Sequence, residues 1–274
     1  MDGQGMPTVP ESISIFDFRP ILIFCIVVAA LLGAVMGSFL NCAAWRIAHG
    51  EKFWKGRSHC PTCGHPLSGA DLVPVLSWLF LRGKCRYCGG KVSPRYLLAE
   101  LFFALVTVLC LLRFDLTVLC LRNWVFLCCL FCLALVDLEA YIIPDGCHLV
   151  SLAAWIVALP FLWNGWKDAG LHVLAGVVFG LGILLISLAL DRILKKESLG
   201  GGDVKLFAVM GLYLGLGQSL LAVILSCVLG LLLGLVKRNE EQHIPFGPAI
   251  SLATVIVLLA GEYFLNWYLG LFAF

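Results

Sequence analysis

The stretch Gly200-Gly201-Gly202-Asp203-Val204-Lys205 directly precedes an apolar segment, which places Asp203 at the edge of a membrane. A carboxylate at that depth is costly and is a functional candidate by default. The three glycines lack Cβ atoms, so the backbone can unwind there or let another chain come close. A flexible loop followed by a capping aspartate explains the same residues equally well. A second carboxylate that meets Asp203 would decide between the two interpretations.

The composition indicates a polytopic membrane protein. The 274 residues are 61% hydrophobic and 13% charged, with a mean hydropathy of +0.98. Soluble domains carry roughly 25% charged residues. The net charge of +2 and the lack of a basic tail give no indication of nucleic-acid binding, and no internal repeat is evident.

Apolar segments predict an all-α fold with about eight transmembrane helices. The first runs from Ile21 to about Asn41, and the polar residues before it lack the positive charge of a signal peptide. Most segments approach the ~20 residues that a helical span requires, although 203–217 is short. The others cover roughly 96–112, 116–137, 147–163, 171–190, 203–217, 219–236 and 248–270.

The Lys and Arg residues predict the orientation. With the N-terminus outside, the outer side holds four of them: Arg19, Arg113, Arg122 and Lys167. The inner loops hold the other fifteen: Arg46, Lys52, Lys55, Arg57, Arg82, Lys84, Arg86, Lys91, Arg95, Arg192, Lys195, Lys196, Lys205, Lys237 and Arg238. By the positive-inside rule, both termini are extracytoplasmic and the 42–95 loop is cytoplasmic.

The 42–95 loop is the one sizeable soluble part, and it holds two CxxC pairs separated by 21 residues: Cys60, Cys63, Cys85 and Cys88. This spacing is typical of four thiolates closing tetrahedrally on zinc. Four sulfur ligands leave no open position, so the metal is expected to be structural and to supply most of the folding energy of the loop. The other nine cysteines lie in or beside apolar segments, where cysteine behaves as a small hydrophobe.

Three acids fall close together at the inner end of the third apolar segment. Asp137 lies at the same predicted depth as Asp203, so packing of the helices can bring the two together. Glu139 is two positions further and should face roughly the opposite side of the helix. Asp145 follows Pro144 at the start of the next segment, where we expect an N-cap.

Other polar residues border the spans. Small residues in Gly37-Ser38-Phe39-Leu40-Asn41 favour close helix packing. Arg95 is expected to extend to the interface, and Glu100, just inside the second segment, to form a salt bridge within the bundle.

Taken together, these motifs resemble the type IV prepilin peptidases, which are leader peptidase/N-methyltransferases of the GxGD class of membrane aspartyl proteases. The resemblance covers nearly the whole chain. The motifs that carry it are Gly37-Ser38-Phe39-Leu40-Asn41, the four cysteines, Asp71-Leu72-Val73-Pro74 with Leu76-Ser77-Trp78, Arg82-Gly83-Lys84-Cys85-Arg86, Arg95-Tyr96, Glu100, Asp137, Pro144-Asp145 and Gly200-Gly201-Gly202-Asp203-Val204-Lys205. Glu139 departs mildly from the family pattern, because relatives often have Asp there.

The resemblance implies that Asp137 and Asp203 are the catalytic pair, supported by Gly200, Gly201, Gly202 and Lys205, and that the four cysteines bind zinc. Two nearby carboxylates share a proton, so one can activate water while the other protonates the scissile carbonyl. Asp203 near a helix N-terminus and close to Lys205 is expected to be the ionised base, and Asp137 near a helix C-terminus the protonated acid.

The same resemblance implies the substrates, the cofactors and the cellular location. The substrates are prepilins or pseudopilins with a short basic leader, cut at the cytoplasmic face of the bacterial inner membrane. S-adenosylmethionine is implied as the donor that methylates the new N-terminus. The expected division is an extracytoplasmic segment 1–20, a first span 21–41, a zinc domain 42–95 and a protease core 96–274. The oligomeric state is left open.

Two other classes of protein use similar residues. An ion-coupled transporter would place such acids near the midplane, in broken helices of related halves. A non-catalytic assembly protein would use the zinc loop to dock partners. Acids at one face and the lack of a repeat favour the peptidase.

Overall fold

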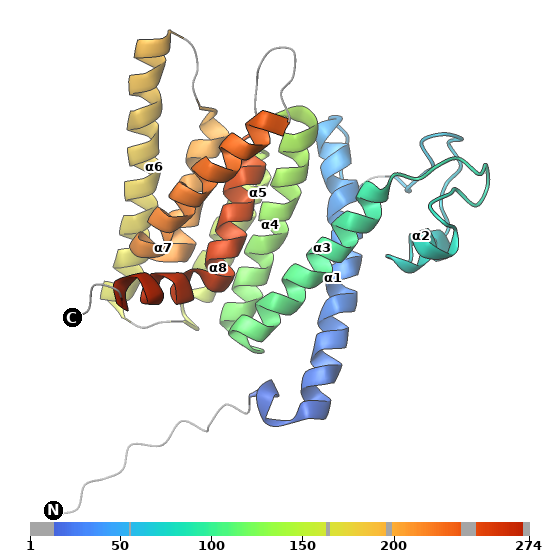
Figure 1. The fold of residues 1–274 in the computed structure, drawn as a ribbon, viewed down its shortest axis with the longest axis horizontal. Coiled ribbons are helices and arrows are strands. Elements are labelled where there is room, and N and C mark those ends of the chain that lie inside the picture. Colours follow the sequence, from blue (N-terminus) through green and yellow to red (C-terminus); the bar gives the residue numbers. More distant parts are fainter. Residues whose placement is uncertain (1–13, 55, 163–164, 196–198, 237–244, 271–274) are drawn as a thin grey trace, which may run out of the picture.

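The computed structural model describes residues 14–54, 56–162, 165–195, 199–236 and 245–270, and this part of the chain is helical apart from loops and two isolated β-bridges (Figure 1). Two 3-10 helices cover Ile15–Asp17 and Gly69–Leu72. The α-helices are α1 (Arg19–Ala48), α2 (Leu76–Phe80), α3 (Pro94–Phe114), α4 (Val118–Ala140), α5 (Asp145–Ala158), α6 (Trp166–Leu194), α7 (Gly201–Val236) and α8 (Gly247–Gly270).

The long helices are those of a membrane protein. Six of the described helices are long and apolar enough to cross a bilayer: α1, α3, α4, α6, α7 and α8. The remaining apolar helix, α5, has 14 residues and would extend about 21 Å. The expected all-α polytopic fold with a small cysteine loop is therefore confirmed.

Helix α7 is interrupted at Gly215, where φ is 70° and ψ is −177°. Before this residue α7 packs along α6, and His172 Nδ1 lies 2.9 Å from the carbonyl oxygen of Leu212. After it α7 packs along α8, with Gly217 against Leu265 and Gly230 against Phe246. The chain therefore reverses at Gly215, a turn that glycine can make because it has no Cβ. The separately expected segments 203–217 and 219–236 correspond to the two arms.

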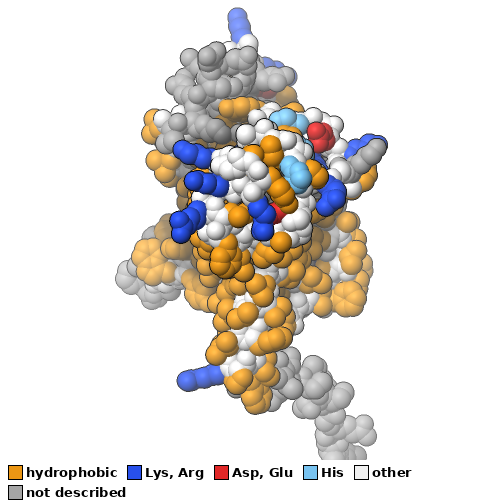
Figure 2. All heavy atoms as spheres, turned by 90° about the vertical axis from the view of Figure 1, so that its right-hand side faces the viewer, with side chains coloured by type: hydrophobic (Ala, Val, Ile, Leu, Met, Phe, Trp, Pro, Cys, Tyr) orange, Lys and Arg blue, Asp and Glu red, His pale blue; other side chains and the backbone are white. Residues whose placement is uncertain are grey.

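The two arms of α7 and the other long helices alternate in direction along the chain. Because α7 reverses at Gly215, the start of α1 and the end of α8 lie at the same end of the bundle (Figure 1). The cysteine loop, the α4–α5 connection and the starts of α7 and α8 lie at the opposite end, which we call the loop end. Figure 2 shows Lys and Arg side chains gathered there above a broad hydrophobic surface. This distribution agrees with the charge asymmetry in the sequence.

Small residues bring α1 against α3, as expected from the sequence. A Cβ added to Gly37 would lie 3.1 Å from the backbone oxygen of Ala99, and one added to Gly33 would lie 2.7 Å from Ala104 Cα. These glycines let the two backbones approach closely.

Several helix boundaries differ from the expectation. Helix α1 continues through the predicted end at Asn41 to Ala48, so the loop between α1 and α3 is shorter than 42–95. Arg46 explains part of this extension, because its guanidinium donates to the carbonyl oxygens of Phe53 and Gly56. The polar end of α1 is thereby joined to the loop, and the charge is satisfied outside the apolar segment.

Candidate active site and metal centre

Asp137 lies one turn before the C-terminal end of α4 and is 5% exposed. Its Oδ2 accepts a hydrogen bond of 2.9 Å from the backbone N–H of Gly247, the first residue of α8. The N-terminus of a helix carries free N–H groups and a partial positive charge, so it stabilises an anion. The structure thus gives Asp137 a partner that favours its ionised form.

Gly247 is a site residue that the sequence analysis missed. A Cβ at this position would lie 2.8 Å from Asp137 Oδ2, closer than real Cβ atoms approach other atoms. Any larger residue would push Asp137 or α8 away and lengthen the N–H···O contact. The only signal in the sequence was the Pro245-Phe246-Gly247-Pro248 stretch before the last apolar segment.

Asp203 is the third residue of α7 and is 9% exposed. Its backbone N–H donates to the carbonyl of Gly200, and its Oδ1 is buried without a hydrogen-bond partner among the described residues. The charges of Asp203 and Asp137 interact electrostatically. Both acids therefore lie at the loop end, at the common depth expected from the sequence and within range of each other's charge.

The glycine run is not unwound. Helix α7 begins at Gly201, so Gly201 and Gly202 are helical. Gly202 packs against Ile143 in the α4–α5 connection, where an added Cβ would lie 2.8 Å from Ile143 Cβ. The small residue lets the start of α7 reach the segment that follows Asp137.

Lys205 is not the partner of Asp203. Its ammonium lies 2.7 Å from Asp145 Oδ1, and both side chains are more than half exposed. The expected N-cap role of Asp145 is wrong, because Pro144 is the N-cap of α5 and Asp145 is the first helical residue. Lys205 instead ties α7 to α5 at the surface and does not neutralise Asp203 directly.

Glu139 and Arg95 form an ion pair of 2.6 Å that joins α4 to α3. Glu139 thus turns away from the contact that Asp137 makes with α8, as its position on the helix predicted. Arg95 does not simply extend to the interface, because it has this carboxylate partner.

Glu100 differs from the expected salt bridge. Its buried carboxylate accepts a 2.7 Å hydrogen bond from the backbone N–H of Val75. Val75 has a φ of 63°, unusual for a β-branched residue, and directly precedes α2. Glu100 therefore attaches the cysteine loop to α3 and holds this strained turn.

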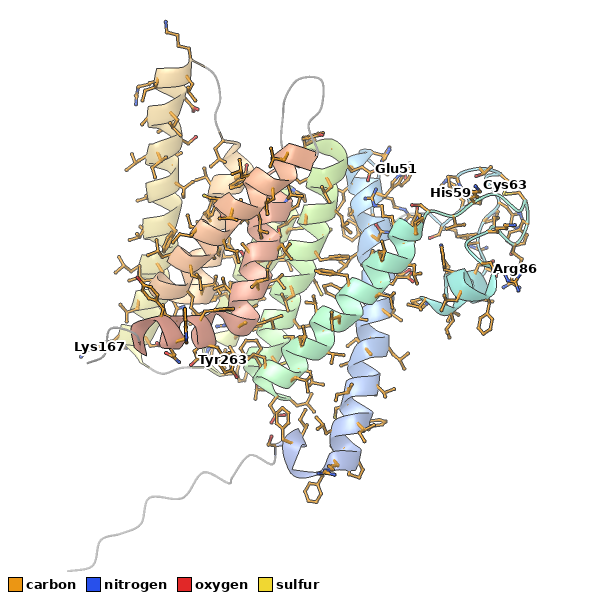
Figure 3. All side chains as sticks on the ribbon, in the orientation of Figure 1. Glu51, His59, Cys63, Arg86, Lys167 and Tyr263 are labelled. Atoms are coloured by element: carbon orange, nitrogen blue, oxygen red, sulfur yellow. The ribbon has the colours of Figure 1, made fainter. Side chains whose placement is uncertain are left out.

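The four cysteines form one cluster in the loop. The sulfurs of Cys60, Cys63, Cys85 and Cys88 all lie within 4.8 Å of one another, and those of Cys60 and Cys88 are 4.0 Å apart. Tetrahedral zinc with Zn–S bonds of about 2.3 Å needs sulfurs about 3.8 Å apart. The cluster can bind a metal of this kind. Figure 3 shows Cys63 and Arg86 in the loop beyond the bundle.

The two CxxC segments have the same backbone structure, although no repeat was evident in the sequence. In the first, the N–H of Cys60 donates to His65 and the N–H of Gly64 donates to Cys60. In the second, the N–H of Cys85 donates to Gly90 and the N–H of Gly89 donates to Cys85 in the same way. Gly64 and Gly89 have φ values of 69° and 70°. Each segment is therefore a tight turn that directs two sulfurs to one point.

The local backbone also favours a thiolate at Cys60. The N–H group of Cys63, with smaller contributions from the N–H of Thr62 and the thiols of Cys85 and Cys63, lowers the pKa of the Cys60 thiol to about 6 against the opposing effect of burial. Against the N–H of Gly90, by contrast, partial desolvation and the neighbouring thiols raise the pKa of Cys88 to about 11. A thiolate is the form that binds metal. The donor set, the separations and the N–H groups all fit a tetrahedral metal ion.

Asp71 connects the second CxxC turn to the rest of the loop. Its carboxylate accepts hydrogen bonds from the N–H and hydroxyl of Ser68, from Arg86 Nε at 2.7 Å and from the Tyr87 hydroxyl. Ser68 makes the largest contribution to lowering the pKa of Asp71 to about 2. Because Arg86 and Tyr87 are the two residues between Cys85 and Cys88, this carboxylate fixes the position of the turn.

Comparisons with known proteins agree with this architecture. Residues 31–114 match the bacterial peptidase A24 N-terminal domain, and residues 124–235 match the type IV leader peptidase family. The first match covers the second half of α1 and the cysteine loop through α3. The second covers most of α4 through most of α7, and so contains both Asp137 and Asp203.

Curated relatives lead to the same family. The chain is 34% identical over 223 residues to the prepilin leader peptidase/N-methyltransferase of Aeromonas salmonicida, covering 78% of this chain and 75% of the relative. It is 32% identical over 247 residues to the enzyme of that name from Bacillus subtilis, covering 87% and 96%. It is 34% identical over 261 residues to the type 4 prepilin-like proteins leader peptide-processing enzyme of Escherichia coli O78:H11, covering 85% and 93%.

The chain therefore belongs to the type IV leader peptidase family and is an enzyme of the A24 peptidases. No solved structure matches it.

Proposed function

We propose that this protein is an aspartyl endopeptidase that removes the short basic leader from prepilins or pseudopilins at the cytoplasmic face of the bacterial inner membrane. The observation that carries the proposal is that Asp137 and Asp203, two buried acids from separate helices, lie at the loop end within range of each other's charge. Two neighbouring carboxylates, one ionised and one protonated, are the groups that hydrolysis of a peptide by activated water requires.

The hydrogen-bond partners suggest which acid plays which part, and they reverse the assignment expected from helix ends alone. Asp137 accepts the N–H of Gly247, whereas Asp203 has a buried oxygen with no partner among the described residues. Burial without a partner favours the neutral carboxyl. We therefore assign Asp137 as the base and Asp203 as the acid in the resting enzyme, with the pair titrating as one unit.

In the proposed reaction, Asp137 takes a proton from a water molecule, and the resulting hydroxide attacks the scissile carbonyl. Asp203 gives its proton to the carbonyl oxygen as the tetrahedral intermediate forms. Asp137 then protonates the leaving amine, and collapse of the intermediate returns a proton to Asp203. The reaction needs no covalent enzyme intermediate.

The site lies at one end of the bundle, beside the basic loop, which suits a substrate whose leader stays at the inner surface while its apolar stem lies in the bilayer. With the Lys and Arg residues inside, both termini would be extracytoplasmic. An ion-coupled transporter is less well supported, because its acids would lie near the midplane.

The four cysteines would hold a structural zinc ion, which would fold the loop and supply no catalytic group. Relatives named as N-methyltransferases suggest a second activity, with S-adenosylmethionine as donor. The described residues form helices and isolated bridges without a βα unit of a nucleotide-binding fold. Methyl transfer is therefore proposed from kinship, without assigned residues.

The test is to incubate the purified full-length protein in liposomes with a membrane-anchored prepilin and S-adenosylmethionine labelled in its methyl group. Mass spectrometry should find the released leader and a mature N-terminus that carries the labelled methyl. Mature protein without the label would remove only the methyltransferase assignment. An intact precursor with wild-type enzyme, when a known family member cleaves the same preparation, would contradict the proposed function.

A further inference from the structure

Helix α2 in the cysteine loop presents an exposed apolar face. The segment 72–81, which contains α2, has no charged residue, and Ser77 carries its only hydroxyl. Leu76, Leu79 and Phe80 lie on one side of α2, because residues three and four positions apart are neighbours on a helix. Leu76 and Leu79 are more than half exposed, and Phe80 is 83% exposed. Exposure of such a face to water is costly, so we expect an apolar medium or partner to cover it.

The other side of α2 is held by the loop itself. Trp78 Nε1 donates to the carbonyl oxygen of Val92, and a Cβ added to Gly83 would lie 2.8 Å from the Trp78 ring. The backbone N–H of Gly83 donates to the carbonyl oxygen of Trp78. These contacts fix how α2 is turned within the loop, and they leave the side with Phe80 largely uncovered by the described residues.

A contact with α3 fixes the depth of α2. The N–H of Val75, the residue before α2, donates to Glu100 Oε2 at 2.7 Å. Helix α3 is one of the helices that can cross a bilayer, and Glu100 lies about 9 Å along its axis from the first residue. Arg95 and Arg113 bracket the apolar part of α3 over about 27 Å, close to the ~30 Å of a hydrocarbon core. Glu100 therefore lies within this apolar part, and its hydrogen bond holds the start of α2 at that depth.

The surroundings at this depth are apolar. Leu98 and Leu101, which flank Glu100 on α3, are 62% and 46% exposed. Figure 1 shows α2 beside α3, at the height of that helix and not above the loop end. In Figure 2, which views the molecule from this side, Lys and Arg side chains lie above a broad hydrophobic surface. Hydrocarbon is the medium that fits this level, whereas water or a soluble partner would meet the loop above it.

Basic residues follow α2 directly. Arg82 and Lys84 are exposed, and their long side chains can reach the phosphate groups of lipids from slightly below the surface. An apolar helix face next to basic residues is typical of helices that lie in the membrane interface. The charge pattern thus agrees with the depth that the contact with Glu100 sets.

We propose that α2 lies in the interface of the leaflet nearest the loop end. Leu76, Leu79 and Phe80 lie among the acyl chains, and Arg82 and Lys84 lie at the headgroups. The cysteine loop is then attached to the membrane at a third point, besides the ends of α1 and α3, and is held at a fixed height beside the bundle. The inference depends on α3 crossing the membrane and does not use the peptidase function.

Electron paramagnetic resonance of the purified full-length protein tests this in liposomes of phosphatidylethanolamine and phosphatidylglycerol. The ketone amino acid p-acetylphenylalanine replaces Phe80 and is coupled to a nitroxide, a reaction that spares the 13 cysteines. Two reference positions are labelled in the same way: Leu105, more than half exposed in the middle of α3, and Glu51, exposed at the end of α1 (Figure 3). Oxygen, which concentrates in hydrocarbon, and a water-soluble nickel chelate serve as the collision reagents.

Position 80 should behave like position 105, with frequent collisions with oxygen and a collision rate with the nickel chelate several-fold lower than at position 51. A nickel collision rate at position 80 equal to that at position 51 would overturn the proposal, because α2 would then lie in water. Low rates with both reagents would overturn it as well, because protein and not lipid would then cover α2.

A crosslinking measurement keeps the test valid if the nitroxide disturbs α2. Photoreactive benzoylphenylalanine replaces Leu79, or Leu105 and Glu51 as references, and the same liposomes are illuminated. Mass spectrometry should find phospholipid acyl chains attached to positions 79 and 105 and none attached to position 51. Attachment of position 79 to a second copy of the chain, or no lipid adduct there, would contradict the proposal. Both measurements run without substrate, so their result is independent of whether the protein cleaves a prepilin.

Discussion

The carboxylate pair and the cysteine cluster differ in what holds their residues together. Asp137 and Asp203 come from α4 and α7, and they lie at the same end of the bundle only because these helices pack into one hydrophobic core. The cysteines come from two short turns with the same hydrogen bonds, and a metal ion can join those turns without help from the bundle. The first site therefore depends on global packing, whereas the second depends on local geometry and metal.

The largest expected effect is on the carboxylate pair. Asp137→Asn or Asp203→Asn should each reduce the rate of leader cleavage by at least about 10³-fold, because each removes one of the two proton-transferring groups. Glu139→Gln is the matched control: it changes an acid on the same helix that pairs with Arg95, and it should retain most of the activity. Rates are measured by single-turnover cleavage of a membrane-anchored precursor. Comparable losses in Glu139→Gln would mean that the assay reports folding.

A smaller loss is expected when the geometry of the pair changes and its chemistry does not. Gly247→Ala should lower kcat by about 10–100-fold, since the new Cβ would displace the Asp137 carboxylate from the N–H that holds it. Gly270→Ala lies on the same helix in open space and should have no effect. Full activity in Gly247→Ala would show that this hydrogen bond is dispensable.

Loss of the metal should affect the cysteine loop much more than the carboxylate pair. Cys60→Ser should reduce bound zinc from about one per chain to near zero and expose the loop to limited proteolysis. Leader cleavage should fall much less than in the aspartate variants, because the two acids lie on α4 and α7, whereas the cysteines lie in the loop between α1 and α3. Cys227→Ser, an exposed thiol on α7, serves as the control. Zinc measured at full occupancy in Cys60→Ser would remove this cysteine from the metal site.

The smallest effect concerns Asp71 and depends on pH. Asp71→Asn should destabilise the loop by about 1–3 kcal/mol, because the hydrogen-bond donors of Ser68, Arg86 and Tyr87 lose a charged acceptor. The pKa of Asp71 is about 2 in the folded loop, below its ordinary value of about 3.9. Its stabilisation is therefore complete above about pH 4 and is lost as the pH falls toward 2.

Proteolysis rates at pH 7 and pH 3 test this. The difference between wild type and Asp71→Asn should shrink at pH 3, because Asp71 of the unfolded chain is then mostly protonated while the folded loop still holds its carboxylate ionised. Glu51→Gln, an exposed acid in the same loop, should match the wild type at both. If the two proteolysis rates differ by the same factor at both pH values, the loop depends on the shape of the Asp71 side chain and not on its charge.

The sequence was informative where function follows from composition and spacing. Hydropathy predicted the membrane helices, and the CxxC pairs predicted the cluster, because the ligands of such a site are close in the chain. The common predicted depth of Asp137 and Asp203 in the membrane indicated that these two acids form a pair. What the sequence could not supply were contacts between distant helix ends: Gly247 against Asp137, Val75 on Glu100, and Lys205 with Asp145. These depend on how helices rotate and cross, which periodicity does not encode.

The same limitation explains why the roles we propose for the two acids are the reverse of those expected from the sequence. Asp203 lies near the N-terminus of its own helix and Asp137 near the C-terminus of its own, which led us to expect the negative charge on Asp203. In the structure, however, the N-terminus of a third helix, α8, directs a backbone N–H at Asp137. That contact lies across the bundle and leaves no pattern in the sequence.

The most direct test of the carboxylate pair is the double variant. Two acids that share one reaction step act as a unit, so Asp137→Asn/Asp203→Asn should be no slower in single-turnover cleavage than either single variant. Multiplied losses would mean that the two residues act independently. Wild-type-like cleavage by either single variant would contradict the account, since water could then be activated without the pair.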